Sequence, residues 1–296
     1  MSVATPSRSG ATRCPACGCS TEDASPAWEF HNVRGQTEWQ RCGRCHSYFM
    51  DDQYTLEDEV EHAEHMSYGD TVIGEKLNEY KRKMYHAVLD QLTCHINPQG
   101  KTLLDVGCSY GGFMQTAQQY GFTVSGLDIV PQAIDHCRSN GLNAQCCGQV
   151  GDFSLTSEPF DVISVLDMHM YWPNQPEELS SIFDRLKPGG LVVMRVVSKS
   201  WLATVGCALQ KVSASQGQKV LRRAVNDHRF SMPLPSFLAL MKNTGFEILV
   251  ATSSGAVHSE HTSFLVRMSF AMGTALQKTL GILLTPGAVV IARRPA

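Results

Sequence analysis

The chain has 296 residues, of which 43% are hydrophobic and 18% are charged; this balance is typical of a globular protein and excludes a disordered or fibrous one. A net charge of −3 provides no broad basic field, which disfavours nucleic acid as a partner. Residues 1–12 contain no apolar run resembling an export signal, and the apolar stretches near the C-terminus fall short of the ~20 residues that cross a bilayer. We therefore expect a cytoplasmic protein with no membrane span.

Two Cys-x-x-Cys pairs stand near the N-terminus, separated by residues 18–41. Their members are Cys14, Cys17, Cys42 and Cys45. Each pair can place two thiolates on one side of a tetrahedral zinc ion. A redox-active pair would be expected in a βαβ setting, which this region lacks, and an odd total of eleven cysteines argues against a closed disulfide set. We predict a zinc ribbon over residues 1–50 with a structural Zn²⁺, and Cys19 and His46 as spare ligand candidates.

Residues 51–100 are predicted to form a linker followed by an amphipathic helix. The stretch 51–65 is acidic and has no Lys or Arg, which indicates a solvated segment. Apolar residues then recur at helical spacing, which predicts a helix that packs on the next domain. These residues are Ile73, Leu77, Tyr80, Met84, Ala87, Val88 and Leu92.

From residue 101 to residue 296, short apolar runs alternate with helical patterns, which predicts an α/β domain with a mostly parallel sheet covered by helices on both faces. The predicted strands are 101–106, 122–127, 143–147, 160–165, 191–197, 246–251 and 288–292. The predicted helices are 112–120, 131–140, 176–186 and 234–244. Residues 198–233 are too long for a simple connection and are predicted to be an insertion over the ligand edge of the sheet.

A glycine-rich segment, Asp105-Val-Gly-Cys-Ser-Tyr-Gly-Gly112, ends the first of these strands and opens a helix, where α/β folds bind nucleotides. A dinucleotide fingerprint would need glycine where Ser109 stands, and Asp105 would place negative charge near a pyrophosphate, which disfavours a nicotinamide dehydrogenase. A carboxylate there favours S-adenosylmethionine, which carries an ammonium and a sulfonium and has no phosphate. Asp128 ends the next strand and is placed to accept hydrogen bonds from ribose hydroxyls.

Four segments in this order resemble the class I S-adenosylmethionine-dependent methyltransferases: LLDVGCSYGGFM, GLDIVP, FDVISVLDMHMYWPN and LKPGGLVVMRV. The resemblance covers about residues 101–197 and implies a Rossmann-like, seven-stranded sheet whose last hairpin is reversed, with AVVIA as the terminal strand. A narrower similarity, to ubiquinone-pathway and deoxysugar C-methyltransferases, is based on the N-terminal cysteines and on residues 228–231.

The same resemblance implies a set of cofactor-binding residues. It places the methionine moiety beside Asp105 and Gly107, the ribose on Asp128 and the adenine near residues 148–152. Gln149 stands where relatives often carry an acid that accepts from the adenine amino group. The full set of expected cofactor residues is Asp105, Gly107, Ser109, Gly111, Asp128, Ile129, Gln149 and Asp167.

The loop after the fourth strand and the insertion face the methyl group in this family, so they hold the candidates for catalysis. Relatives often carry a Glu-His pair where this chain has Met170-Tyr171. His169 and His228 are the candidate general bases, each with an ordinary structural role as the alternative. We expect His169, Tyr171 and His228 to converge on one pocket beneath the insertion.

These features predict methyl transfer to a small-molecule acceptor of the kind handled in biosynthetic pathways. RNA methylation is a second hypothesis, and a non-catalytic zinc-ribbon adaptor with a relic cofactor site is a third. The net charge and the acidic stretch 51–65 weigh against RNA. Basic residues around the insertion keep it open: Lys199, Lys211, Lys219, Arg222, Arg223 and Arg229.

Overall fold

The computed structural model describes residues 12–32, 35–51, 58, 60–61, 79–225, 228–253 and 287–296. Most of the predicted linker, including 62–78 with Ile73 and Leu77, lies outside these residues. The helix predicted after it is described from Glu79 onward as α3 (Glu79–Thr93). Among the described residues, no helix combines the length and the apolar character needed to cross a membrane.

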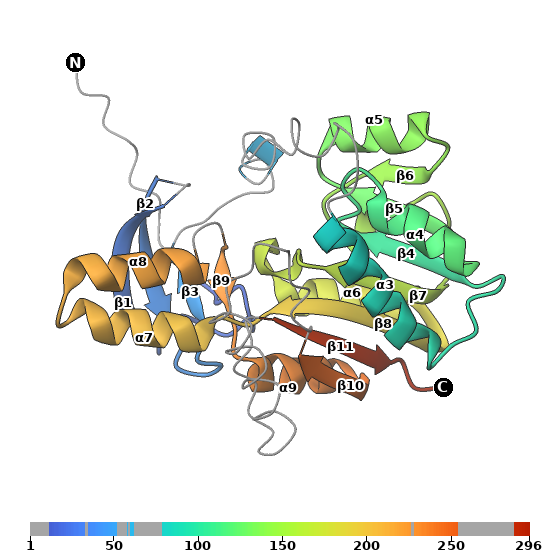
Figure 1. The fold of residues 1–296 in the computed structure, drawn as a ribbon. Coiled ribbons are helices and arrows are strands. Elements are labelled where there is room, and N and C mark those ends of the chain that lie inside the picture. The colour runs from blue at the N-terminus through green and yellow to red at the C-terminus, as the bar shows by residue number, and fades with distance from the viewer. Residues whose placement is uncertain are drawn as a thin grey trace.

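A seven-stranded sheet forms the centre of the protein (Figure 1), in the order β10-β11-β8-β7-β4-β5-β6. Neighbouring strands from β6 to β8 run parallel, and β11 pairs antiparallel with both β8 and β10. The strands are β4 (Thr102–Val106), β5 (Thr123–Asp128), β6 (Asn143–Cys146), β7 (Phe160–Leu166), β8 (Leu186–Val197), β10 (Glu247–Ser253) and β11 (Gly287–Arg293). This confirms the predicted sheet and its reversed last strand.

Helices cover both faces of this sheet because strands such as β4 and β7 are buried on both sides. On one face α3, α4 (Gly112–Tyr120) and α5 (Pro131–Ser139) supply apolar side chains to a common cluster. On the other face α6 (Gln175–Arg185) and α9 (Leu234–Thr244) do so. The four helices predicted between residues 101 and 296 begin and end within one residue of the observed α4, α5, α6 and α9.

A second, smaller sheet joins the N-terminal segment to the predicted insertion. Its order is β1-β2-β3-β9, with β1 (Ser25–Asn32), β2 (Gly35–Arg41), β3 (Tyr48–Met50) and β9 (Phe230–Ser231). β3 and β9 pair antiparallel although they lie far apart in the sequence. The N-terminal segment is therefore not a separate appendage, because residues of the insertion complete its sheet.

The rest of the insertion is a helical hairpin of α7 (Ser200–Gln210) and α8 (Ala214–Val225) that lies beside this small sheet (Figure 1). Trp28 and Trp39 stack at 5.3 Å between ring centroids, in one buried cluster with Leu221, Ala224 and Val225. The two helices approach closely, since a side chain at Gly206 or Gly217 would overlap the facing helix. The hairpin thus buries its inner face against the N-terminal sheet.

Candidate functional site

A cavity of about 200 Å³ lies at the carboxyl ends of β4, β5 and β7, where parallel sheets bind ligands. The glycine-rich loop forms one wall, and the loops after β5 and β7 form the next two. Helix α3 supplies a fourth wall through Lys81, Met84 and Tyr85. None of the lining residues that the structure describes belongs to the predicted insertion, 198–233. The inner face of its helical hairpin packs against β1–β3 instead.

The glycine-rich loop has a backbone that favours glycine at two of its positions. Gly107 has φ +77°, and a Cβ there would lie 3.0 Å from the Met168 side chain at the cavity wall. Gly111 has φ +81°, and a Cβ there would overlap the buried Leu142. Gly111 is not among the lining residues of the cavity, and in the structure it allows the loop to pack closely on Leu142.

Asp105 places a buried carboxyl group at the floor of the cavity. Burial raises its pKa to about 7, the Ser164 hydroxyl that donates to it at 2.7 Å acts in the opposite direction, and the nearby Asp128 carboxylate raises it further. A cationic ligand would favour the charged form of this group. Attraction to the Asp105 carboxylate therefore favours binding of a positively charged ligand in this cavity.

Asp128 is anchored by the backbone on both sides. Its carboxylate accepts from the amide of Ser109 at 2.8 Å and from the amide of Val130 at 3.0 Å. Burial raises its pKa, and these backbone donors oppose that shift. Asp128, Ser109 and the adjacent Ile129 all line the cavity, as the sequence predicts.

Asp167, after β7, carries an acceptor that no described residue satisfies. It has φ +57°, lines the cavity and forms an ion pair with Arg195 through Oδ2. Its Oδ1 is buried and has no hydrogen-bond partner within the described part of the chain. Because a buried carboxylate oxygen strongly favours a donor, Asp167 suits an ammonium group in the cavity.

The expected adenine segment contributes only in part. Cys147 and Gly148 line the cavity, whereas Gln149 is not among its lining residues. The next amide, of Val150, donates to the buried Glu178 at 3.1 Å. Of the segment expected near the adenine, residues 148–152, Gly148 is the described residue that lines the cavity, and Cys147 lines it from just before that segment.

The three catalytic candidates do not all converge on the cavity. Tyr171 lines it. His228 is buried behind Tyr171 and meets its ring edge-on, with 6.1 Å between ring centroids. His169 is fully buried and lies against Phe230 and Phe237. Burial lowers the pKa of His169 to about 4, so the structure places it in the core as a neutral ring.

Sequence reasoning missed the contribution of α3. Its helical periodicity predicts a packed helix, yet Lys81 and Tyr85 lie within one turn of each other and reach the cavity. Lys81 is the one cation among the lining residues that the structure describes. The signal available in the sequence was the cluster Lys81-Arg82-Lys83 at the start of an otherwise ordinary amphipathic pattern.

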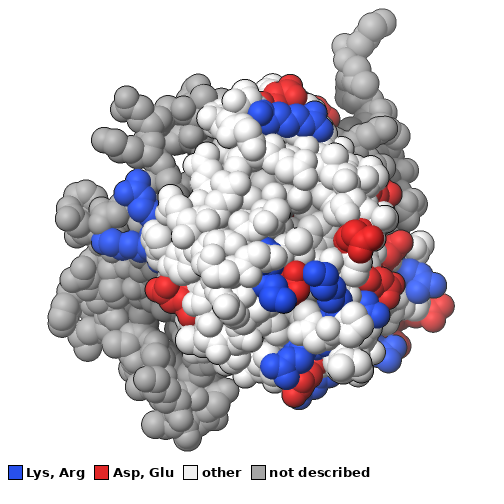
Figure 2. Space-filling view, turned by 90° about the vertical axis from the view of Figure 1, so that its right-hand side faces the viewer, with Lys and Arg blue, Asp and Glu red and all other residues white. Residues whose placement is uncertain are grey.

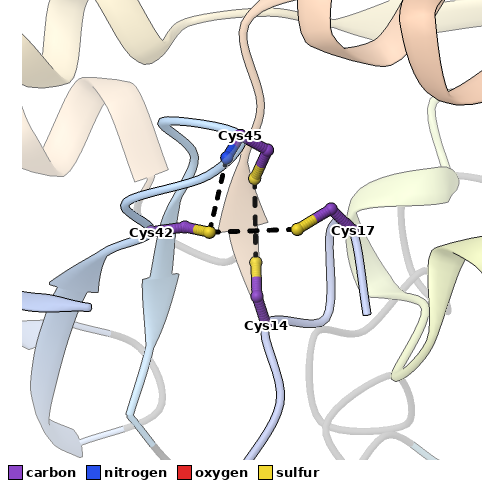
Figure 3. Close-up of side chains that lie close together, drawn as sticks. All are labelled: Cys14, Cys17, Cys42 and Cys45. Carbon is purple, nitrogen blue, oxygen red and sulfur yellow. Dashed lines mark hydrogen bonds between the residues drawn. The ribbon is translucent and has the colours of Figure 1, made fainter. Parts of the chain in front are cut away.

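A second candidate site lies in the N-terminal segment, where four thiols point toward one another from two turns (Figure 3). Their Sγ atoms all lie within 4.8 Å of one another. The distance is 3.9 Å from Cys14 to Cys45 and 3.8 Å from Cys17 to Cys42. Four thiolates about 2.3 Å from one zinc ion would be about 3.8 Å apart, so the group has the geometry to hold a metal ion.

The spare ligand candidates differ in position. Cys19 lies 3.2 Å from Cys17 and 3.4 Å from Cys42, measured between sulfur atoms, so a fifth thiol borders the cluster. His46 is exposed and has φ +59°. The amide of Cys45 donates to the Cys42 sulfur at 3.5 Å, as in turns that hold metal thiolates.

The four-cysteine cluster is joined to the loop after β7 by one buried side chain, Gln175. The side-chain Nε2 of Gln175 donates to the carbonyl of Ala16 at 3.0 Å, and the backbone N–H of Gln175 donates to the carbonyl of Pro15 at 2.9 Å. Its Oε1 lies 2.8 Å from Nδ1 of His169. Since Nε2 already donates, Oε1 is the acceptor and the Nδ1–H of His169 donates to it. The first cysteine turn is thereby tied to the segment that bears Tyr171.

One face of the molecule carries charged groups of both signs. Figure 2 shows one face of the molecule, the right-hand side of Figure 1, on which basic and acidic groups alternate around uncharged surface. That face therefore presents no single-sign field of the kind that attracts a phosphate backbone.

Comparison with known proteins adds independent findings. A family model described as a methyltransferase domain matches residues 77–251 and begins after the cysteine cluster. The chain is 26% identical over 170 residues to the ubiquinone biosynthesis O-methyltransferase of Azoarcus sp. (strain BH72), covering 54% of this chain and 70% of that protein. It is 30% identical over 141 residues to the protein of the same name from Pseudomonas fluorescens (strain Pf0-1), covering 45% and 59%.

Among solved structures, the chain is similar to the plantazolicin methyltransferase BpumL in complex with SAH. The TM-score is 0.51 at 15% identity, over 81% of this chain and 99% of that chain. Identity this low shows a common fold only.

Proposed function

We propose that the chain, which belongs to the methyltransferase domain family, transfers a methyl group from S-adenosylmethionine to a small-molecule acceptor. When bound, the cofactor supplies an electrophilic methyl group on a sulfonium sulfur. The observation that carries the proposal is the set of carboxyl groups in one cavity, Asp105, Asp128 and Asp167. Asp105 is buried and Asp128 is partly buried, and neither forms an ion pair within the described part of the chain, which suits a ligand with two positive charges.

Each wall of the cavity has a part in holding the cofactor. Asp128 would accept from the ribose hydroxyls, with Ile129 beside it, and Cys147 and Gly148 border the adenine position. The unsatisfied Oδ1 of Asp167 and the carboxyl group of Asp105 would receive the ammonium end. Lys81 would pair with the carboxylate end.

The acceptor would lie against Tyr171, which lines the cavity with aromatic and thioether neighbours from α3 and the glycine-rich loop. This lining suits the apolar body of a small organic acceptor, and the ubiquinone-pathway names of the relatives support a small molecule over RNA. If the acceptor must lose a proton, Tyr171 would be the candidate base among the three, because it lines the cavity, while His228 packs edge-on against its ring. His169 would act through position only, by fixing the loop that bears Tyr171.

Calorimetry with S-adenosylhomocysteine tests the cofactor site. We expect Asp128→Ala to weaken binding by at least ~1 kcal/mol, about fivefold, the scale of a hydrogen bond to a charged group. Asp135→Ala, which removes an exposed carboxylate from α5, is the matched control and should leave the affinity unchanged. Equal affinities for both variants would remove Asp128 from the site, and circular dichroism would confirm that each variant is folded.

Label transfer tests the acceptor class. The protein would be incubated with methyl-labelled S-adenosylmethionine and, in parallel, with a metabolite filtrate or with total RNA. We expect label in the metabolite fraction only, and we expect Tyr171→Phe to reduce it. Label in RNA would contradict the proposal for the acceptor and leave the cofactor assignment intact.

We further propose that the metal is zinc, bound by Cys14, Cys17, Cys42 and Cys45. A four-thiolate site leaves no open position for water, so the ion would be structural. We expect about one zinc per chain by mass spectrometry of metal content. A Cys14→Ser/Cys42→Ser double variant should lose it, whereas the exposed Cys94→Ser should keep it. Full zinc in the double variant would overturn the assignment.

A further inference from the structure

Helix α7 presents an apolar stripe to solvent. Trp201, Val205, Leu209 and Val212 are 38%, 44%, 37% and 89% exposed. Their spacing places them on one side of the helix and its C-terminal extension. Only one other large hydrophobic side chain in the described part of the chain is exposed to this degree, Leu155 on a distant loop.

The apolar stripe is not the side of α7 that packs against the rest of the protein. The opposite side of α7 is already buried, through Ser200, Ala203 and Gly206. Gly206 lets Leu221 of α8 approach so closely that a Cβ would lie 2.8 Å from it. The helix is therefore apolar on both sides, and its outer side has no intramolecular use among the described residues.

The neighbouring helix α8 carries positive charge on its outer side. Lys219, Arg222 and Arg223, with Ser215 and Gln218, border one shallow hollow of about 540 Å³. The buried side of α8 holds Gly217, Leu221, Ala224 and Val225, so the basic side faces away from the small sheet.

Charge in this segment is of one sign. Residues 198–225 contain five Lys or Arg residues and no Asp or Glu. The whole chain has a net charge of −3, so the remainder carries −3 minus +5, or −8. On a protein that is acidic elsewhere, a basic segment is the part that attracts anionic surfaces electrostatically.

We propose that the α7–α8 hairpin is a docking surface for an anionic lipid bilayer. The apolar stripe would enter the boundary between headgroups and acyl chains, with Trp201 at the interface where tryptophan is favoured. The basic side of α8 would pair with the anionic headgroups. A nucleic acid would use the basic side only and would leave Val205, Leu209 and Val212 in water, so the combination favours a membrane. This proposal is independent of the proposed methyl transfer.

The test is co-sedimentation of the full chain with vesicles of phosphatidylglycerol and phosphatidylcholine, and with vesicles of phosphatidylcholine alone. We expect binding to the anionic vesicles that weakens with added salt, and at least tenfold weaker binding for Trp201→Ser/Val205→Ser. The matched control is Leu155→Ser, an equally exposed apolar side chain away from the hairpin. Lys219→Gln should also weaken binding, whereas Lys242→Gln on α9 should not.

Three results would overturn the proposal. The first is no preference for anionic over neutral vesicles. The second is binding to duplex RNA that is lost in Lys219→Gln but kept in Trp201→Ser/Val205→Ser, which would assign the hairpin to nucleic acid. The third is a dimer in light scattering that the apolar double variant converts to a monomer, which would assign the stripe to a second copy of the chain. All of these substitutions are at exposed positions, so thermal denaturation should match the parent protein.

Discussion

Replacement of Gln175 by Met tests whether the cysteine cluster and the loop after β7 stabilise each other. Methionine has nearly the same volume and shape as glutamine, so the change removes hydrogen bonds without opening a large cavity. The lost partners are Nδ1 of His169 at 2.8 Å, the carbonyl of Ala16 at 3.0 Å and the weakly accepting sulfur of Met232 at 3.2 Å. Gln175, His169 and Ala16 are all 0% exposed, so water cannot take the place of the lost amide.

The magnitude follows from leaving one buried donor and one buried acceptor without partners. Each costs about 1–3 kcal/mol, so we expect Gln175→Met to lower the free energy of unfolding by roughly 2–6 kcal/mol. Gln145 provides the matched control, because its side chain also donates to a carbonyl, of Asp152 at 3.0 Å, and accepts from an amide, of Ser154 at 2.8 Å. Gln145 lies near the surface, where water can replace both bonds, so Gln145→Met should cost less than ~1 kcal/mol.

The assay is equilibrium urea unfolding of the zinc-loaded full chain, followed by tryptophan fluorescence. A chelator competition on the same samples should show faster zinc loss from Gln175→Met, because the Gln175 side chain fixes the turn between Cys14 and Cys17. Equal destabilisation by the two glutamine variants would refute the reasoning. So would a loss below ~0.5 kcal/mol with unchanged zinc release.

Three further predictions concern the cofactor loop and the metal. The pKa of Asp105 is raised to about 7, so affinity for the cationic cofactor should fall by up to tenfold per pH unit below pH 7; Asp105→Asn should flatten this dependence in calorimetry, and an unchanged slope would exclude the role. Gly111→Ala should lower thermal stability more than Gly141→Ala, because both have positive φ but only the first overlaps Leu142; equal melting temperatures would remove the packing argument. Zinc removal should speed deuterium exchange at the Gln175 amide and leave β4 unchanged; equal protection with and without zinc would show that the turn holds without metal.

The predictable part of the fold was the part encoded locally. The strands around Asp105 and Asp128 are short apolar runs that end in acids, and their order along the chain determines which edge of the sheet they share. The four-cysteine cluster was predictable for a similar reason. Each pair is close in the sequence, so only one contact, between the two pairs, is needed to form a four-thiol metal site. The metal-like geometry and the lining positions of Asp105, Ser109 and Asp128 agree with those predictions.

What the sequence did not reveal depends on contacts between distant segments. His169 stands two residues from the cavity-lining Tyr171, yet the short turn between them directs it into the core beside Phe230 and Phe237. The direction of a side chain in such a turn depends on what packs beneath it, and no local pattern shows that. The cavity wall from α3 and the pairing of the insertion with the N-terminal sheet also depend on contacts between distant segments, so no local pattern shows them.

The two-residue strand β9 has a consequence for how this protein is made. A ribosome releases the cysteine-bearing segment first, but Tyr48 and Phe49 meet their partners Ser231 and Phe230 only after about 180 further residues have been synthesised. During vectorial synthesis the β3 edge of the N-terminal sheet therefore stays open while strands β4 to β8 of the central sheet are synthesised. Early capture of the metal would give the nascent segment a local closure that does not depend on the late strand. The ion would then protect the segment during synthesis as well as in the finished protein.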